Sequence, residues 1–140
     1  MSRVSYVNGR YYPHKEVNVH VEDRGYQFAD GVYEVILVKN RLLVDEIPHL
    51  DRLERSLGAL EIASPMKRQS LKMVLEEVID RNKFKDGIVY IQVTRGVARR
   101  DHGFPKFSKP TLVITARPLN SAVKRQKLKG RRSLLFLTLD

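Results

Sequence analysis

The chain has 140 residues, 42% of them apolar, which is enough for one ordinary packed domain. It contains no cysteine, so disulfide bonds, cysteine-ligated zinc and thiol catalysis are excluded. A total of 26 Lys and Arg against 16 Asp and Glu gives a net charge of +10, which makes nucleic-acid binding one hypothesis. Residues 1–12 lack the apolar stretch of a secretory signal, and no run approaches the roughly 20 apolar residues of a membrane span. We therefore expect a cytoplasmic protein.

The N-terminal residues predict strands. Asn8-Gly9 stands between two short runs rich in Tyr and Val, and this dipeptide supplies the positive φ angles of a type I′ hairpin turn. Valines then alternate with polar residues over 17–21, a period that predicts a half-buried strand. After a polar stretch with two glycines, residues 32–38 predict another strand, which turns at Lys39-Asn40 into residues 41–44.

Two helices are expected next. Pro48 suits a first helical turn, and leucines then recur at spacings of three and four to form one apolar stripe: Leu50, Leu53, Leu57 and Leu60. Ser64-Pro65 ends that helix. The second helix runs from about Lys67 to Asn82, and its inner face consists of Leu71, Val74, Leu75, Val78 and Ile79.

The remaining pattern returns to strands. Asp86-Gly87 turns the chain into a strand over 88–94, residues 96–109 form a long polar loop, and residues 111–116 form the next strand. Strands, two helices and then strands indicate an α+β domain.

Two segments contain the residue types of a functional site. The segment from Asp23 to Glu34 gathers charged, Tyr and Gln side chains around two glycines; the alternative is a solvated loop. The glycines lack the spacing of a phosphate-binding loop. The segment from Arg95 to Pro105 carries Arg99, Arg100 and His102, whose directed donors suit a carboxylate or phosphate, although a solvated basic loop is again the alternative.

Other chemistries have little support. The four histidines, His14, His20, His49 and His102, have no spacing typical of metal ligands, so we expect no metal site. His49 is interpreted as an ordinary polar residue near a helix start. A serine hydrolase is not supported, because the Gly-x-Ser-x-Gly pattern is absent.

Residues 23–35 read Asp-Arg-Gly-Tyr-Gln-Phe-Ala-Asp-Gly-Val-Tyr-Glu-Val and closely resemble the signature of bacterial D-amino-acid aminotransferases, which are class IV, pyridoxal-phosphate-dependent enzymes. Two further blocks resemble that family in the same order: His-Leu-Asp-Arg-Leu at 49–53, and Ile-Gln-Val-Thr-Arg-Gly at 91–96 with Arg-Asp-His at 100–102. The resemblance covers roughly residues 5–120. It implies the N-terminal domain of the class IV fold, an antiparallel sheet with two helices packed against it. Branched-chain aminotransferases and aminodeoxychorismate lyases share this fold and are the alternatives.

The resemblance implies a role for individual residues. Arg52 matches the arginine that contacts the phosphate of pyridoxal 5′-phosphate, and a bidentate cation suits that role. Tyr33, Arg100 and His102 match the three residues that hold the substrate α-carboxylate and select the D-enantiomer. Val35 matches a residue that lines the pocket for the substrate side chain.

The resemblance also implies partners and supporting residues. The substrates are a D-amino acid and a 2-oxo acid, of the D-alanine and 2-oxoglutarate type. The loop with Arg100 and His102 reaches the active site of a partner subunit in this family, which implies a homodimer. Arg24 and Asp30 are expected to brace the loop and not to touch substrate.

The C-terminal residues depart from the family pattern. The lysine that forms the Schiff base with the cofactor follows, in the family, the point at which this chain ends, so no catalytic residue is assigned. We expect residues 1–120 to be the N-terminal domain and residues 121–140 to be a basic interdomain linker with an aberrant tail. The C-terminal catalytic domain is then absent and the fragment inactive alone. A shifted reading frame is one hypothesis for the tail, and a truncation or a natural divergent end are the others.

Two other functions remain as alternatives. The basic residues from Lys124 to Arg132 suggest a nucleic-acid-binding module, although no aromatic residues interleave them for base stacking. Such binding would weaken steeply with salt. The other alternative is an inactive remnant whose exposed surfaces make it prone to aggregation.

Overall fold

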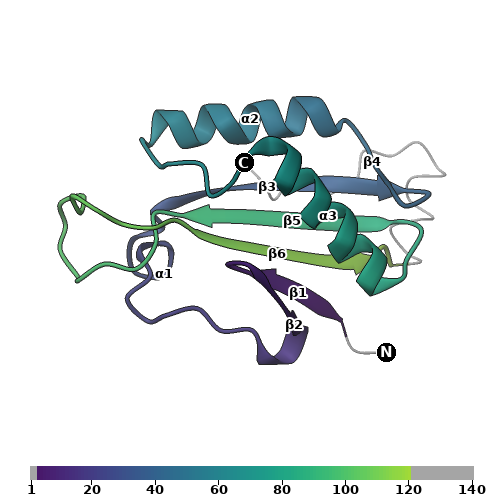
Figure 1. Cartoon of the computed structure of the whole chain (residues 1–140), viewed down its shortest axis with the longest axis horizontal. Helices are drawn as coiled ribbons and strands as arrows, with labels where there is room; N and C mark the ends of the chain where they lie inside the picture. Colours follow the sequence, from purple (N-terminus) through teal and green to yellow (C-terminus); the bar gives the residue numbers. More distant parts are fainter. Residues whose placement is uncertain (1–2, 121–140) are drawn as a thin grey trace.

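The computed structural model describes residues 3–120, which form a six-stranded antiparallel sheet of order β2-β1-β6-β5-β3-β4 (Figure 1). The strands are β1 (Val4–Val7), β2 (Arg10–Pro13), β3 (Gly31–Lys39), β4 (Leu42–Leu43), β5 (Gly87–Thr94) and β6 (Thr111–Pro118). The helices are α1 (Arg24–Phe28), α2 (Glu46–Ala59) and α3 (Arg68–Asn82), with a 3-10 turn η1 (His14–Glu16). The predicted α+β domain, an antiparallel sheet with two helices packed against it, is confirmed.

The N-terminal hairpin forms as predicted. Val7 pairs with Arg10 across a two-residue turn, in which Asn8 has φ 46° and Gly9 has φ 97°. Positive φ at both central residues is the type I′ requirement, and its twist matches that of the flanking strands.

The strand predicted over residues 17–21 is wrong. After η1 these residues have no regular structure, and Val19 and Val21 are exposed. The Asn18 side chain donates to the Glu16 carbonyl, and the Glu22 amide donates to His20 Nδ1. Alternation produces a strand only where a neighbouring strand pairs with it; here side-chain bonds to the local backbone take the place of a ladder.

The polar segment that follows is not simply a solvated loop. Asp23 is the N-cap of α1, because its Oδ1 accepts from the Gly25 amide at 2.8 Å, and Ala29 ends the helix in the left-handed region with φ 54°. Asp23 and Arg24 are both buried. This segment is therefore a packed connection that leads directly into β3.

Both long helices cover the same face of the sheet. In Figure 1, α2 runs along β3 and α3 crosses in front of β5 and β6. The predicted inner face of α3 packs into the core, and so do three leucines of α2, but Leu60 lies after the end of α2 and is part-exposed, which corrects the predicted four-leucine stripe. The core side of the sheet is formed by alternate residues of three strands: Ile36, Val38, Val89, Ile91, Val93, Leu112, Ile114 and Ala116.

Neither long helix lies on the opposite face of the sheet, which is called the uncovered face below. Most of the side chains of β3, β5 and β6 that point there are part-buried or exposed. Thr94 and Thr111 are buried, and α1 lies against Thr94 at this end of the face. Within residues 3–120, no helix has both the length and the apolar character needed to span a membrane.

Candidate functional site

The uncovered sheet face displays two of the predicted substrate residues, Tyr33 and Val35. They occupy alternate positions of β3, opposite Gln92 and Tyr90 of β5. The Tyr33 and Tyr90 rings lie 5.9 Å apart between centroids, and the Tyr90 hydroxyl donates to Gln92 Oε1 at 2.6 Å. Burial, with a further effect from Tyr33, raises the pKa of the Tyr90 hydroxyl, so it stays a neutral donor. A polar and aromatic patch thus lies on the half of the sheet next to α1.

Arg52, the predicted phosphate ligand, lies on α2 and is held by Glu34. The Glu34 carboxylate belongs to the helix-covered face of β3 and is buried, and it accepts Arg52 Nε at 2.6 Å and Nη2 at 2.9 Å. It also contacts His49 Nδ1 at 2.8 Å. The Arg52 side chain nevertheless remains 60% exposed, so its cation is presented to solvent in a fixed orientation.

The electrostatics of this group follow from its geometry. Burial by itself raises the pKa of Glu34, but the hydrogen bonds from Arg52 and His49 outweigh it and hold that pKa below its usual range. The hydrogen bond to Glu34 in turn raises the pKa of Arg52, with a smaller effect from Tyr33.

The other two predicted residues, Arg100 and His102, lie on the loop between β5 and β6. This loop projects beyond the end of the sheet on the side of α1 (Figure 1). Both contact Phe28, the last residue of α1: the Arg100 guanidinium lies 5.3 Å from the ring centroid, and the His102 ring packs edge-on at 5.6 Å between centroids. Both side chains are exposed. Within one chain, the four predicted substrate residues therefore form two groups, Tyr33 and Val35 on the sheet and Arg100 and His102 on the loop, and Arg52 stands apart from both on α2.

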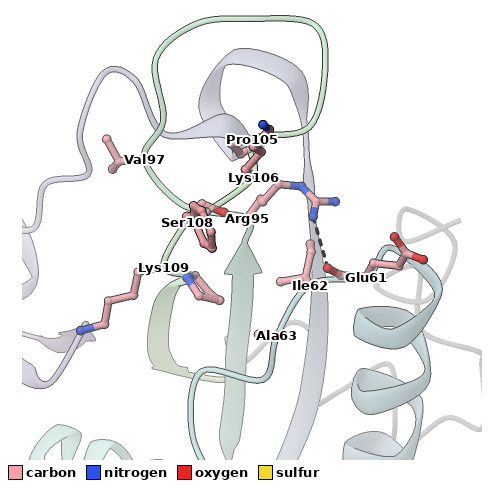
Figure 2. Close-up of a pocket in the computed structure, with 11 residues that line it drawn as sticks. Glu61, Ile62, Ala63, Arg95, Val97, Pro105, Lys106, Ser108 and Lys109 are labelled. Atoms are coloured by element: carbon pink, nitrogen blue, oxygen red, sulfur yellow. Dashed lines mark hydrogen bonds between the residues drawn. The ribbon is translucent and has the colours of Figure 1, made fainter.

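The base of the loop encloses a pocket of about 610 Å³ against the end of α2. Its walls are residues 61–63 on one side and residues 105–110 of the loop on the other. Figure 2 shows Arg95 reaching across to the segment after α2, where its guanidinium donates to the carbonyls of Leu60 at 2.7 Å and Glu61 at 3.3 Å. None of the five predicted residues lines this pocket.

The arrangement suits an anion, and metal ligands are not grouped. Residues 3–120 contain no cluster of three or more His, Asp or Glu side chains able to hold a metal ion. Arg52, by contrast, combines an accessible cation with a rigid attachment, which is the chemistry needed to hold a phosphate. One exposed guanidinium of this kind is compatible with a phosphate, and the role expected for Arg52 stays a prediction.

Several residues of these groups were not predicted from the sequence. Glu34 and His49 lie inside the matching blocks, yet only the structure shows that Glu34 holds Arg52. His49 lies near the start of α2, as expected, and its ring contacts the Glu34 carboxylate. Tyr90 and Gln92 join Tyr33 through strand pairing, which alternation in β5 alone could have indicated.

Comparisons with known proteins agree with the fold and the blocks. Residues 31–136 match the family model described as amino-transferase class IV. The D-alanine aminotransferase of Bacillus licheniformis is 39% identical over 120 residues, 86% of this chain and 42% of that protein. Among solved structures, a branched-chain amino acid aminotransferase of Escherichia coli superposes with a TM-score of 0.81 at 16% identity over 90% of this chain and 43% of that one. The 4-amino-4-deoxychorismate lyase of Pseudomonas aeruginosa gives 0.68 at 24% over 89% and 43%.

The chain thus spans about two fifths of the length of the relatives it matches. Enzymes of the matched family use pyridoxal 5′-phosphate. The family model covers most of the chain, and the alignment with the Bacillus licheniformis enzyme covers 86% of it. The chain belongs to the class IV aminotransferase family.

Proposed function

We propose that this chain is the N-terminal domain, residues 1–120, of an enzyme that transfers the amino group of a D-amino acid to a 2-oxo acid. The observation that carries this proposal is the division of residues between the sheet and the loop. Tyr33 and Val35 offer a hydroxyl and an apolar wall on the uncovered face, and Arg100 and His102 offer directed donors on a projecting loop. The 39% identity to a D-alanine aminotransferase supports D-amino acids over the substrates of the branched-chain enzymes and lyases.

In this proposal Arg52 holds the cofactor phosphate. Glu34 keeps its guanidinium directed and charged, so the phosphate meets a cation that needs no reorganisation. When bound, pyridoxal phosphate supplies an electron-withdrawing ring that allows the proton on the substrate Cα to be removed. The chain described here contributes orientation: it fixes the phosphate at one end and the substrate carboxylate at the other.

We further propose that the carboxylate is gripped across a homodimer. The loop projects away from the sheet, and Arg100 and His102 rest on Phe28 and not on the Tyr33 face of their own subunit. A second copy is needed for the two groups to converge. Arg100 then pairs with the carboxylate, and Tyr33 and His102 donate to it, which fixes the face of Cα that is presented.

A chimaera tests this function. Residues 1–120 replace the aligned part of the Bacillus licheniformis D-alanine aminotransferase, and amino transfer from D-alanine and from L-alanine to 2-oxoglutarate is measured. We expect cofactor loading, seen as the absorbance of bound pyridoxal, and a preference for D-alanine. Arg100→Ala should raise the KM for D-alanine and the KM for 2-oxoglutarate about 100-fold, because each substrate loses the ion pair between its carboxylate and the arginine.

Lys106→Ala, on the same loop, is the matched control and should change neither KM. A chimaera that binds the cofactor but prefers L-alanine, or a branched L-amino acid, would contradict the D-amino-acid proposal. A chimaera whose KM values do not respond to Arg100→Ala would contradict the carboxylate site. The nucleic-acid alternative depends on residues 124–132, which lie outside the described residues.

A further inference from the structure

A buried carboxylate, Asp30, connects the sheet to the loop that carries Arg100 and His102. Its Oδ2 accepts Nε of Arg24 at 2.8 Å and Nε of Arg95 at 2.7 Å, and all three side chains are less than 10% exposed. Arg24 belongs to α1, Asp30 lies just before β3, and Arg95 follows β5. One carboxylate oxygen therefore joins three parts of the chain at the sheet end from which the loop departs.

The backbone makes the same junction. The Arg95 amide donates to the Asp30 carbonyl at 3.0 Å, and the Arg24 amide donates to the Gly96 carbonyl at 2.9 Å. These bonds fix where the two arginines stand. Their side chains are then directed by the carboxylate, because two guanidinium groups this close would repel each other without an anion between them.

From this position both arginines reach the apex of the loop. Arg24 Nη1 donates to the Asp101 carbonyl at 2.7 Å. The ring of Phe104 lies over Arg95, with 4.0 Å from Cζ to the centroid, and 5.8 Å from Cζ of Arg24. Asp101 and Phe104 lie on either side of His102 in the sequence, and Arg100 directly precedes Asp101.

Phe28 completes the attachment. Arg24 lies 4.6 Å from the centroid of its ring, and Arg100 and His102 pack on the same ring. Within the loop, the hydrogen bond from the Gly103 amide to Asp101 Oδ1 is long, at 3.5 Å. The conformation of the loop is thus set by α1 and the two arginines more than by bonds inside the loop.

We propose that Asp30 is a positioning residue: through Arg24 and Arg95 it fixes Asp101 and Phe104, and so presents Arg100 and His102 for carboxylate binding. This inference rests on the proposed function for the role of Arg100 and His102, but the attachment of the loop is testable without substrate. Asp30 itself does not touch the substrate.

Because the sequence has no cysteine, a single introduced cysteine gives a unique site for a nitroxide spin label in the full chain. Gly103→Cys places it at the loop apex, where a Cβ meets no atom within 4 Å. Asp30→Asn keeps the size of the side chain and removes its charge. We expect the rotational correlation time of the label to shorten about threefold or more, towards that of a free loop.

Two controls make the result specific. Asp80→Asn is the same substitution in an exposed ion pair with Arg41, and it should leave the loop label unchanged. Gly58→Cys carries a label on α2, again with no atom within 4 Å, and its spectrum should not respond to Asp30→Asn. If Asp30→Asn does not fold, Arg24→Lys keeps the charge but cannot reach both Asp30 and Asp101, and it should loosen the loop label in the same way.

A loop label that keeps its correlation time in the Asp30 or Arg24 variant would overturn the proposal, and so would equal loosening at both label sites, which indicates general destabilisation. In the chimaera, Asp30→Asn should raise KM about tenfold with a smaller change in kcat, because carboxylate binding is misaligned. If Asp30→Asn loosens the loop but substrate binding by the chimaera does not depend on Arg100, Asp30 still positions the loop and the proposed function is refuted. If the loop is unchanged but substrate binding depends on Arg100, the proposed function stands and the positioning role of Asp30 is refuted.

Discussion

Glu34 is a buried carboxylate whose two partners both come from α2. It is part of the helix-covered face of β3, where the neighbouring positions of the same face, Ile36 and Val38, are apolar and fully buried. A carboxylate at such a position is tolerated because Arg52 and His49 satisfy both oxygens. The charge is therefore retained in the folded protein, and it depends on α2 being docked.

Glu34→Gln should destabilise the fold at neutral pH by about 2 kcal/mol, because charged hydrogen bonds to Arg52 and His49 are lost. The loss is no larger because Arg52 is largely exposed and water can solvate its charge. The pKa of Glu34 is lowered in the folded state, so its ionised form contributes stability above the pKa of the unfolded chain. That contribution is lost as the pH falls through the lowered pKa. Urea unfolding at pH 7 and at about pH 3 measures the difference between variant and parent at each pH.

Glu77→Gln serves as the control, because Glu77 forms an exposed i,i+4 pair with Arg81. It should shift the free energy of unfolding by less than about 0.5 kcal/mol. A Glu34 variant whose deficit stays constant between the two pH values would show that the carboxylate contributes no pH-dependent stability.

The site residues that belong to a sequence motif could be picked out from the sequence. The residues whose burial depends on a distant partner could not. Arg52 and Tyr33 stand out in matching blocks, and their roles remain proposals. Arg95 looked like one more member of a basic loop, yet it is buried against Asp30. Its burial depends on an acid 65 residues earlier in the chain, a pairing that spacing along the sequence does not show.

At the scale of elements, the β5–β6 loop closes on a glycine. Gly96 has φ 103°, and a Cβ there would lie 1.8 Å from the Lys109 carbonyl oxygen. The two ends of the loop thus approach each other more closely than any side chain permits. Gly103, at the apex, has open space around it.

Gly96→Ala should lower the free energy of unfolding by roughly 2–4 kcal/mol. Alanine is strained at a positive φ angle, and its Cβ would clash with the Lys109 carbonyl oxygen. Gly103→Ala should be close to neutral. The measurement is the unfolding midpoint of the two variants in denaturant at equal slope. Equal midpoints would mean that the loop ends separate at little cost.

The long elements followed from periodicity, and the connections did not. The apolar positions of α3 and the β-branched run of β5 each match one period and recur in the core. Residues 17–21 show the period of a strand as clearly, but no strand within residues 3–120 pairs with them. α1 is short and polar, and it exists because Asp23 caps it, a signal confined to one side chain.

For the whole molecule, apolar side chains gather at the loop end of the fold. Phe107 is 93% exposed, and exposed apolar residues of α1 and the loop include Tyr26, Val97 and Phe104. Exposed apolar side chains are typical of protein contacts. We therefore expect the proposed second copy to bind at this end of the fold.

Self-association of the protein should therefore depend on the exposed apolar side chains at the loop end of the fold. Phe107→Ser should weaken dimer formation about tenfold or more, since burial of a phenylalanine ring is lost. Sedimentation equilibrium measures the change. Leu42→Ser alters a similarly exposed residue on β4, away from the loop, and should have no effect. If both substitutions weaken the dimer equally, or if neither weakens it, the contact between the subunits lies elsewhere.

The strand order also determines when the described sheet can be completed during synthesis. The hairpin of β1 and β2 is made first, yet β1 pairs with β6, the last strand of the described chain. Until β6 has left the ribosome, the hairpin has no strand to pair with, only its contact between Val4 and Asn82 of α3, and the edge of β5 stays open. Closure of such distant segments is slow, and an unpaired edge invites the wrong neighbour. A pause in translation before residue 118 would prolong the time for which this edge is exposed.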